Sequence, residues 1–247
     1  MARRPLLLLF AEMPEWFRRE SNNWILQGYR PISGSIRASF HSRSYIHNES
    51  VNIYSHLIPG MLFLLGEVYI MHYLAVKYDG VNAADFIAFS IFMLAATICL
   101  LMSAVYHTLM NHSQHVERVC LRLDMLGVVV FIMGDLVLGI HVVFWCEPVA
   151  RRVWSMIALF GGLTIFMTTH PKFQGLKYRL ARALMFVATG LCGVAPVIHG
   201  LKIFGISQMM KKAFPYTMAK AGCLLSGTAF YAVSSPKVAR KEDMDLI

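Results

Sequence analysis

The chain has 247 residues, of which 57% are hydrophobic, and it carries a formal net charge of +9. Its mean hydropathy of +0.54, with the apolar residues gathered in long blocks, excludes an ordinary soluble domain and indicates a polytopic membrane protein. The basic residues flank the hydrophobic runs instead of forming one patch, which excludes a nucleic-acid-binding protein.

Residues 1–52 are polar and aromatic, and we expect them to form a cytosolic segment ahead of the membrane. The start resembles a signal peptide, but its apolar core, Leu6 to Ala11, is shorter than the roughly 7–15 residues that such a peptide needs. Glu12 to Gln27 contains aromatic and aliphatic side chains that favour a short interfacial helix on the cytoplasmic face of the membrane.

Six apolar runs follow, and each is long enough to cross a bilayer, which takes roughly 20 residues. They lie near residues 53–76, 84–110, 124–146, 153–170, 181–201 and 214–234. The loops between them are short, so the sequence predicts an all-α membrane helix bundle over residues 53–234. Residues 235–247 are polar and are expected to be a cytosolic tail.

Basic residues concentrate on alternate sides of these runs. The richer set contains Arg3, Arg4, Arg18, Arg19, Arg30, Arg37, Arg43, Arg118, Arg122, Lys172, Lys177, Arg179, Arg182, Lys237, Arg240 and Lys241. The thinner set contains Lys77, Arg151, Arg152, Lys202, Lys211 and Lys212. Cytoplasmic loops carry the excess of Lys and Arg, so the N-terminus is predicted to lie in the cytoplasm.

A polar stripe enters the first apolar run within HNESVNIYSHLIPG. Glu49, Asn52, Ser55 and His56 are three or four residues apart and would share one helical face. Helix capping accounts for some of them, because an acidic residue is favourable at a helix N-terminus, but it does not account for His56, one turn inside. We interpret the stripe as a structural hydrogen-bond network.

Ser103, His107 and Asp124 are the strongest candidates for chemistry. Ser103 and His107 lie one helical turn apart at the end of the second run, and Asp124 opens the third at a similar depth. One interpretation is a zinc site with His107 as a ligand and Asp124 and Ser103 around the metal. The other is a polar cluster at a helix turn, and spacing alone favours this second interpretation.

Other ionisable residues in the apolar runs are also functional candidates, because a charged side chain inside a membrane is energetically unfavourable. Asp135, Glu67 and His141 would be the path of a small transporter or channel, while His170 is the one substitute metal ligand on the cytoplasmic side. For Asp135 we favour a protonated group that is bonded to a neighbouring helix, and for His170 a loop residue before Pro171.

Three motifs resemble the progestin and adiponectin receptor family, which includes the haemolysin III-like proteins. The first is NWILQGYRP followed by HNESVNIYSHLIPG. The second runs from Ser103 to His107, through Asp124 to Gly127, and on to IMG at residues 132–134. The third, softer motif starts at PKFQGLKYRLARALMF and extends toward His199. The likeness covers residues 22–236 and is best to fungal members.

The resemblance implies a seven-helix receptor-like bundle with a cytoplasmic N-terminus and a zinc-dependent amidase that acts on ceramide-like lipids. His107 would be the first zinc ligand, Asp124 would position the zinc-bound water, and Ser103 would complete the polar shell. The resemblance therefore favours the zinc interpretation. Met125 stands where many members of the family have tyrosine.

The chain departs from the family pattern after the sixth run. Members have a seventh helix that opens with a His-x-x-x-His pair and supplies two further zinc ligands, whereas KVARKEDMDLI contains no histidine. We therefore expect six of seven helices, a partial Zn²⁺ site, and a chain that is the truncated product of a seven-helix gene.

The expected function is a receptor-like role in lipid signalling and metal homeostasis, with an incomplete ceramidase-like site. The alternative is a non-catalytic six-helix scaffold or a partner of a full-length relative. The expected partners are membrane lipids, including a ceramide-like substrate. The sequence leaves open the membrane, the ligand, and whether the chain forms homo- or hetero-oligomers.

Overall fold

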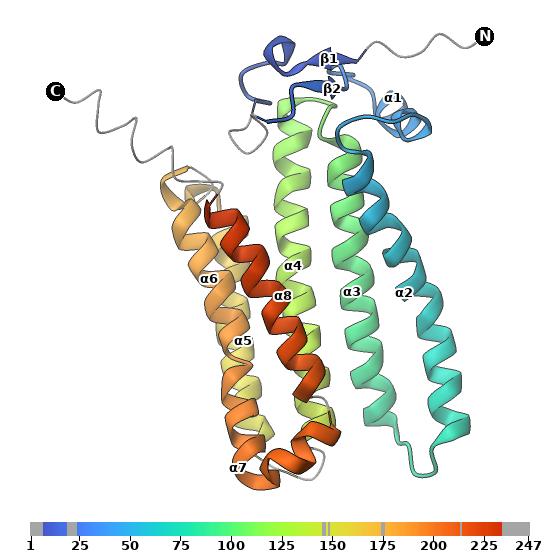
Figure 1. The fold of residues 1–247 in the computed structure, drawn as a ribbon, viewed down its shortest axis with the longest axis vertical. Helices are drawn as coiled ribbons and strands as arrows, with labels where there is room; N and C mark the ends of the chain where they lie inside the picture. The colour runs from blue at the N-terminus through green and yellow to red at the C-terminus, as the bar shows by residue number, and fades with distance from the viewer. Residues whose placement is uncertain are drawn as a thin grey trace, which may run out of the picture.

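The structure is a computed structural model that describes residues 7–18, 24–144, 147, 149–173, 176–212 and 214–233. Long helices dominate these residues (Figure 1). They are α2 (Ser50–Lys77), α3 (Ala83–Leu109), α4 (Gln114–Val143), α5 (Ala150–Thr169), α6 (Arg179–Leu191), α7 (Val194–Lys211) and α8 (Phe214–Val233). In Figure 1, α2, α3 and α4 run side by side, and α5 to α8 form a second group next to α4.

Five helical segments in the described part of the chain are long and apolar enough to cross a membrane. They are Ser50–Lys77, Ala83–Leu109, Gln114–Val143, Arg152–Thr169 and Leu180–Lys211. The protein is therefore an all-α integral membrane protein. The sequence predicted a sixth span over 214–234, where the structure places α8, but α8 is not among these five segments. The expected tail over 235–247 lies outside the described residues.

The predicted fifth span, 181–201, is two helices that together reach further along the chain. Helix α6 ends at Leu191, and α7 begins at Val194 and runs to Lys211 with a kink at Gly205, whose φ is 70°. Pro196 lies in the first turn of α7, where a missing backbone N–H leaves no hydrogen bond unmade. If α6 and α7 were one helix, Pro196 would lack the N–H that bonds the preceding turn. Because α7 begins two residues before Pro196, no such hydrogen bond is lost.

A small N-terminal layer covers one end of α3 and α4 (Figure 1). It contains the antiparallel strands β1 (Leu8–Leu9) and β2 (Gln27–Tyr29), the short helix α1 (Ile36–His41), and the 3₁₀ turns η1 (Phe10–Glu12) and η3 (Ser42–Ser44). The expected interfacial helix over Glu12–Gln27 does not form in the described part of that stretch, residues 12–18 and 24–27, which consists of turns, extended chain and the start of β2.

Packing explains why this stretch is not helical. Met13 and Phe17 are buried together with Tyr29, and this cluster packs on Tyr106 of α3 and Cys120 of α4. Of the side chains that suggested a membrane-facing helix, Trp16 and Phe17 pack in this small core against the ends of the bundle, whereas Trp24, Ile25 and Leu26 remain exposed. Burial of large apolar side chains of this kind contributes about 1.5–3 kcal/mol each, which outweighs a weak helical preference.

Helices α3 and α4 approach each other through small residues. A Cβ placed on Gly134 would lie 2.6 Å from Cβ of Ala95 and 3.2 Å from the carbonyl oxygen of Ile91. A Cβ on Gly127 would lie 3.0 Å from Cα of Cys99. Small residues at helix interfaces allow backbones to pack closely in membranes, where hydrophobic burial supplies little driving force. This contact fixes the depth of Asp124, one turn before Gly127, relative to α3.

Candidate functional site: a polar cluster where α2 and α3 meet

The structure places the three predicted site residues on two neighbouring helices. Ser103 and His107 lie on α3, and Asp124 lies on α4. Ser103 is 6% exposed and Asp124 is 8% exposed, so both are buried polar groups. The side chain of His107 retains 18% of its exposure in the last turn of α3.

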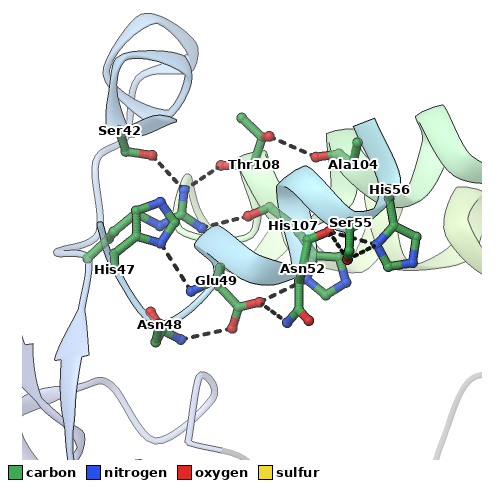
Figure 2. Close-up of polar contacts among 11 residues, drawn as sticks. Ser42, His47, Asn48, Glu49, Asn52, Ser55, His56, Ala104, His107 and Thr108 are labelled. Atoms are coloured by element: carbon green, nitrogen blue, oxygen red, sulfur yellow. Dashed lines mark hydrogen bonds and ion pairs between the residues drawn. The ribbon is translucent and has the colours of Figure 1, made fainter. Parts of the chain in front are cut away.

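His107 is joined to the polar stripe of α2. Its Nδ1 lies 2.8 Å from Oε2 of Glu49, the residue that immediately precedes α2. The same carboxylate accepts hydrogen bonds from the side-chain amides of Asn48 and Asn52, each at 2.8 Å. Figure 2 shows Glu49, Asn52 and His107 converging. We call these residues, together with His56, the Glu49–His107 cluster.

His56 extends the cluster one turn into α2. Its ring stacks on that of His107 with 5.8 Å between centroids and 30° between planes. Its Nδ1 lies 2.6 Å from the backbone oxygen of Asn52, and Ser55 lies beside it (Figure 2). The stripe that the sequence predicted as a hydrogen-bond network is therefore such a network, and its partner helix is α3.

Arg30 holds the N-terminal layer on this cluster. Its guanidinium, 1% exposed, donates to the backbone oxygens of His107 (2.6 Å) and Thr108 (2.9 Å) and to the hydroxyl of Ser42 (2.8 Å). The last carbonyls of a helix have no partner within the helix, and a basic side chain can satisfy them. Arg30 is thus a cap for α3, a role that the sequence did not reveal because only its charge was counted.

The electrostatics of the cluster follow from burial and pairing. Burial raises the pKa of Glu49, but the hydrogen bonds from His107 and Asn52 and the charges of His107 and Arg30 outweigh it, so the net pKa is lowered. Burial lowers the pKa of Arg30 to about 10, against the opposing influence of Glu49. At neutral pH, Glu49 is therefore an ionised hydrogen-bond acceptor, and the guanidinium of Arg30 is positively charged.

An ionised Glu49 fixes the tautomer of His107. A carboxylate only accepts hydrogen bonds, so Nδ1 of His107 carries the proton that it shares with Oε2. When the imidazole is neutral, Nε2 is then the nitrogen that remains for accepting a proton or binding a metal. A histidine held by a carboxylate in this way is oriented for chemistry at its far nitrogen.

The described residues do not fit a complete zinc site. Among them, no group of three or more His, Cys, Asp or Glu side chains is placed to hold a metal ion. His170, the predicted substitute, contacts the rings of Phe166 and Phe173, and its Nδ1 accepts the backbone N–H of Lys172 at 3.3 Å. Among the described residues, the geometry therefore supports an oriented imidazole at His107 without a three-ligand metal cage around it.

Two of the three residues proposed for a transport path, Asp135 and His141, have partners on other helices. Asp135 forms an ion pair with Lys220 of α8, and Nε2 of His141 lies 2.8 Å from Oδ1 of Asp85 near the start of α3. The sequence anticipated a partner for Asp135 on another helix, but as a protonated group and without identifying Lys220. Both pairs join one helix to another, which is a structural role for residues that are costly in a membrane.

Comparison with known proteins places the chain in context. Residues 44–247 match the family described as haemolysin-III related. The chain is 29% identical over 230 residues to an adiponectin receptor protein of Drosophila melanogaster, with 92% of this chain and 51% of the relative covered. It therefore spans about half the length of that relative.

Two further relatives are covered more fully. The chain is 29% identical over 241 residues to ADIPOR-like receptor IZH2 of Saccharomyces cerevisiae, covering 96% of this chain and 75% of the relative. It is 30% identical over 245 residues to heptahelical transmembrane protein 1 of Arabidopsis thaliana, covering 95% of this chain and 71% of the relative. The similarity thus extends across animals, fungi and plants.

Proposed function

Because the chain belongs to the haemolysin III-related family, which includes adiponectin and progestin receptor relatives, we propose that it is a receptor-like membrane protein of lipid signalling. The responsive centre in this proposal is the Glu49–His107 cluster. The observation that supports it most is the 2.8 Å contact between the Glu49 carboxylate, just before α2, and the His107 imidazole, in the last turn of α3. Ionisable groups at membrane depth are costly and mark functional sites.

Zinc is a further part of the proposal. His107 would be the metal ligand through Nε2. Ser103, one turn earlier on α3, and Asp124, on α4, would be the polar groups around the metal. The described residues do not complete the coordination that a zinc amidase needs, so we derive no reaction step from this site. Hydrolysis of a ceramide-like amide and a part in metal homeostasis remain proposals that rest on the family.

The topology belongs to the same proposal. The distribution of Lys and Arg supports a cytoplasmic N-terminus, and α8 would be the sixth span of a receptor-like bundle. In that orientation, the Glu49–His107 cluster lies at the cytoplasmic side of the membrane. Its partners would be membrane lipids, with a ceramide-like amide as substrate, and homo- or hetero-oligomers of the chain fit the same proposal.

The signalling proposal is tested by lipid analysis of cells that express the full chain, His107→Ala, or His115→Ala at equal abundance in the membrane. His115 is an exposed histidine in the first turn of α4 and is the matched control. We expect the full chain and His115→Ala to change sphingolipid levels, and His107→Ala to leave them at the level of cells without the protein. Identical lipid profiles for all three variants would contradict a role for the cluster.

Zinc is tested separately by titration of the purified chain in detergent against a chromophoric chelator. We expect weak binding of up to about one zinc per chain, because two or fewer protein ligands hold zinc less tightly than the usual three or four. His107→Ala should lose this binding and His115→Ala should keep it. Equal binding by the full chain and His107→Ala would remove zinc from the proposal and leave the receptor-like role standing.

One observation favours a second function. The lack of a metal-holding group among the described residues suits a non-catalytic membrane scaffold or a partner of a full-length relative. This alternative gives normal membrane insertion, no ceramide hydrolysis by purified protein with added zinc, and no change on His107→Ala. Hydrolysis that depends on His107 would exclude it.

A further inference from the structure

A shallow pocket lies where the chain enters the first membrane helix. It has a volume of about 380 Å³ and lies between η3, the extended residues after it and the first turns of α2. Arg43 lines it on one side, and Ile46, Val51 and Tyr54 form its apolar wall. The pocket lies apart from the Glu49–His107 cluster, since neither Glu49 nor His107 lines it.

The two sides of the pocket are held together by hydrogen bonds. The hydroxyl of Tyr54, on α2, donates to the backbone oxygen of Arg43 at 2.7 Å. The hydroxyl of Ser50, in the first turn of α2, accepts the backbone N–H of His47 at 2.9 Å. These contacts fix η3 against α2, so the pocket is formed before any ligand arrives, and binding would cost little ordering of the chain.

Arg43 is the cationic side chain among those that line the pocket. Its contacts with Phe40 hold the guanidinium in place and leave its positive charge unpaired in the described part of the chain. Its guanidinium carbon lies 4.6 Å from the centroid of the Phe40 ring, and its Nε donates to the backbone oxygen of Phe40 at 3.3 Å. Within the described residues, Arg43 takes part in none of the ion pairs. Its terminal nitrogens therefore keep the fork geometry that binds a phosphate with two hydrogen bonds.

The opposite wall is apolar and strongly exposed. Ile46 is 86% exposed, Val51 is 78% exposed, and Tyr54 is 40% exposed. Side chains at the start of a membrane span lie in the membrane interface, where headgroups meet the first acyl carbons, and tyrosine is favoured at this level. A cation at the headgroup level above an apolar wall matches one molecule of an anionic phospholipid.

We propose that this pocket binds an anionic glycerophospholipid, with its phosphate on Arg43 and an acyl chain along Val51 and Ile46. The proposal is independent of zinc and of the Glu49–His107 cluster. It requires only that α2 enters the bilayer at its first turn, and a cytoplasmic N-terminus would place the pocket in the leaflet that is rich in anionic lipids.

The test is native mass spectrometry of the full chain in detergent with dioleoylphosphatidylserine or dioleoylphosphatidylcholine. We expect retention of phosphatidylserine in preference to phosphatidylcholine, and a loss of about tenfold in affinity on Arg43→Gln, since the charge-assisted hydrogen bonds to the phosphate are lost. Arg43→Lys keeps the positive charge but not the two-pronged geometry of the guanidinium. Its affinity for phosphatidylserine should lie between that of the unchanged protein and that of Arg43→Gln. Arg118→Gln, an exposed cation at the start of α4 on the same side of the bundle, is the matched control and should bind normally.

Two further measurements separate the lipid from its headgroup. Ile46→Ser removes part of the apolar wall and should weaken phosphatidylserine binding, while soluble glycerophosphoserine should not compete. Equal losses on Arg43→Gln and Arg118→Gln, equal retention of the two lipids, or full competition by glycerophosphoserine would each overturn the proposal. Circular dichroism and elution volume of each variant show that the fold is kept.

Discussion

Replacement of Arg30 should disturb the candidate site through the end of α3, where its guanidinium binds two backbone oxygens. Arg30→Met keeps the length of the side chain but leaves the backbone oxygens of His107 and Thr108 without their donor. Each buried carbonyl left unsatisfied costs about 1–3 kcal/mol. We expect a clear drop in the thermal unfolding midpoint in detergent, with no drop for Arg37→Met, an exposed arginine on α1. Equal midpoints would mean that water replaces the arginine.

His47 should make stability depend on pH. Burial, and then the charge of Arg30, lowers its pKa from 6.5 to about 4, against the raising influence of Glu49. Its Nδ1 accepts the N–H of Glu49, and its buried Nε2 has no hydrogen-bond partner within the described residues. Its ring faces Tyr45, with 5.8 Å between centroids. The folded protein therefore holds His47 neutral in a place where a proton would be costly.

The sign of the effect follows from the depressed pKa. Above pH 6.5, the imidazole is neutral in both the folded and unfolded states and has no effect on the difference between them. As the pH falls from 6.5 toward 4, the unfolded chain takes up a proton that the folded chain does not, so stability declines. Thermal unfolding across this window should show a smaller decline for His47→Asn, which keeps an acceptor for the Glu49 N–H. A decline of the same size in both proteins would assign it to other groups.

The sequence predicted the members of the cluster better than their pairing. Glu49, Asn52 and His56 share a face because helical spacing requires it, and Ser103 and His107 do so for the same reason. That Glu49 meets His107 could not be predicted, because the two are 58 residues apart and their contact depends on how α2 packs on α3. The missed role of Arg30 has the same cause, since its contacts join it to residues 77 and 78 positions away.

At the scale of elements, the α3–α4 contact depends on the absence of a side chain at Gly134. Gly134→Ala places a methyl group 2.6 Å from Cβ of Ala95, so the two helices must separate. Overpacking of this kind costs about 1–3 kcal/mol, more than the gain of about 1 kcal/mol in helix propensity. Gly139→Ala lies on the same helix with nothing within 4 Å and gains the propensity alone.

We therefore expect the unfolding midpoint to fall for Gly134→Ala and to stay level or rise for Gly139→Ala. Asp124 moves with α4, so Gly134→Ala should also weaken any ligand binding that uses Asp124 and His107 together. A midpoint for Gly134→Ala at or above that of the unchanged protein would show that α4 can shift without loss.

Element boundaries show where pattern reasoning was limited. Apolar run length located α2 and α3 closely because bilayer thickness determines the length of a span, but it placed the start of α4 at residue 124, ten residues after Gln114, where the helix begins. It did not reveal the break between Leu191 and Val194, since the residues around the break stay apolar. In Glu12–Gln27, Trp16 and Phe17 pack in the cluster that contains Tyr106 and Cys120, and no local pattern encodes those distant partners.

For the whole molecule, the distribution of charge predicts the orientation in the membrane. A loop that carries a glycosylation acceptor, inserted after Gly80 between α2 and α3, should be modified in a eukaryotic cell, because that turn faces away from the cytoplasm in the proposed topology. The same loop inserted after His112, between α3 and α4, should remain unmodified. The reverse pattern would invert the membrane orientation and place the Arg43 pocket in the outer leaflet.

The capping of α3 by Arg30 also indicates where the folding unit begins. The family match begins at residue 44, yet the donor that completes the end of α3 is contributed fourteen positions earlier in the chain, at Arg30. The strand pair and the buried Tyr29 beside it belong to the same upstream stretch. The folding unit therefore extends upstream of the region that matches the family, and a fragment limited to residues 44–247 would expose the helix end that carries His107.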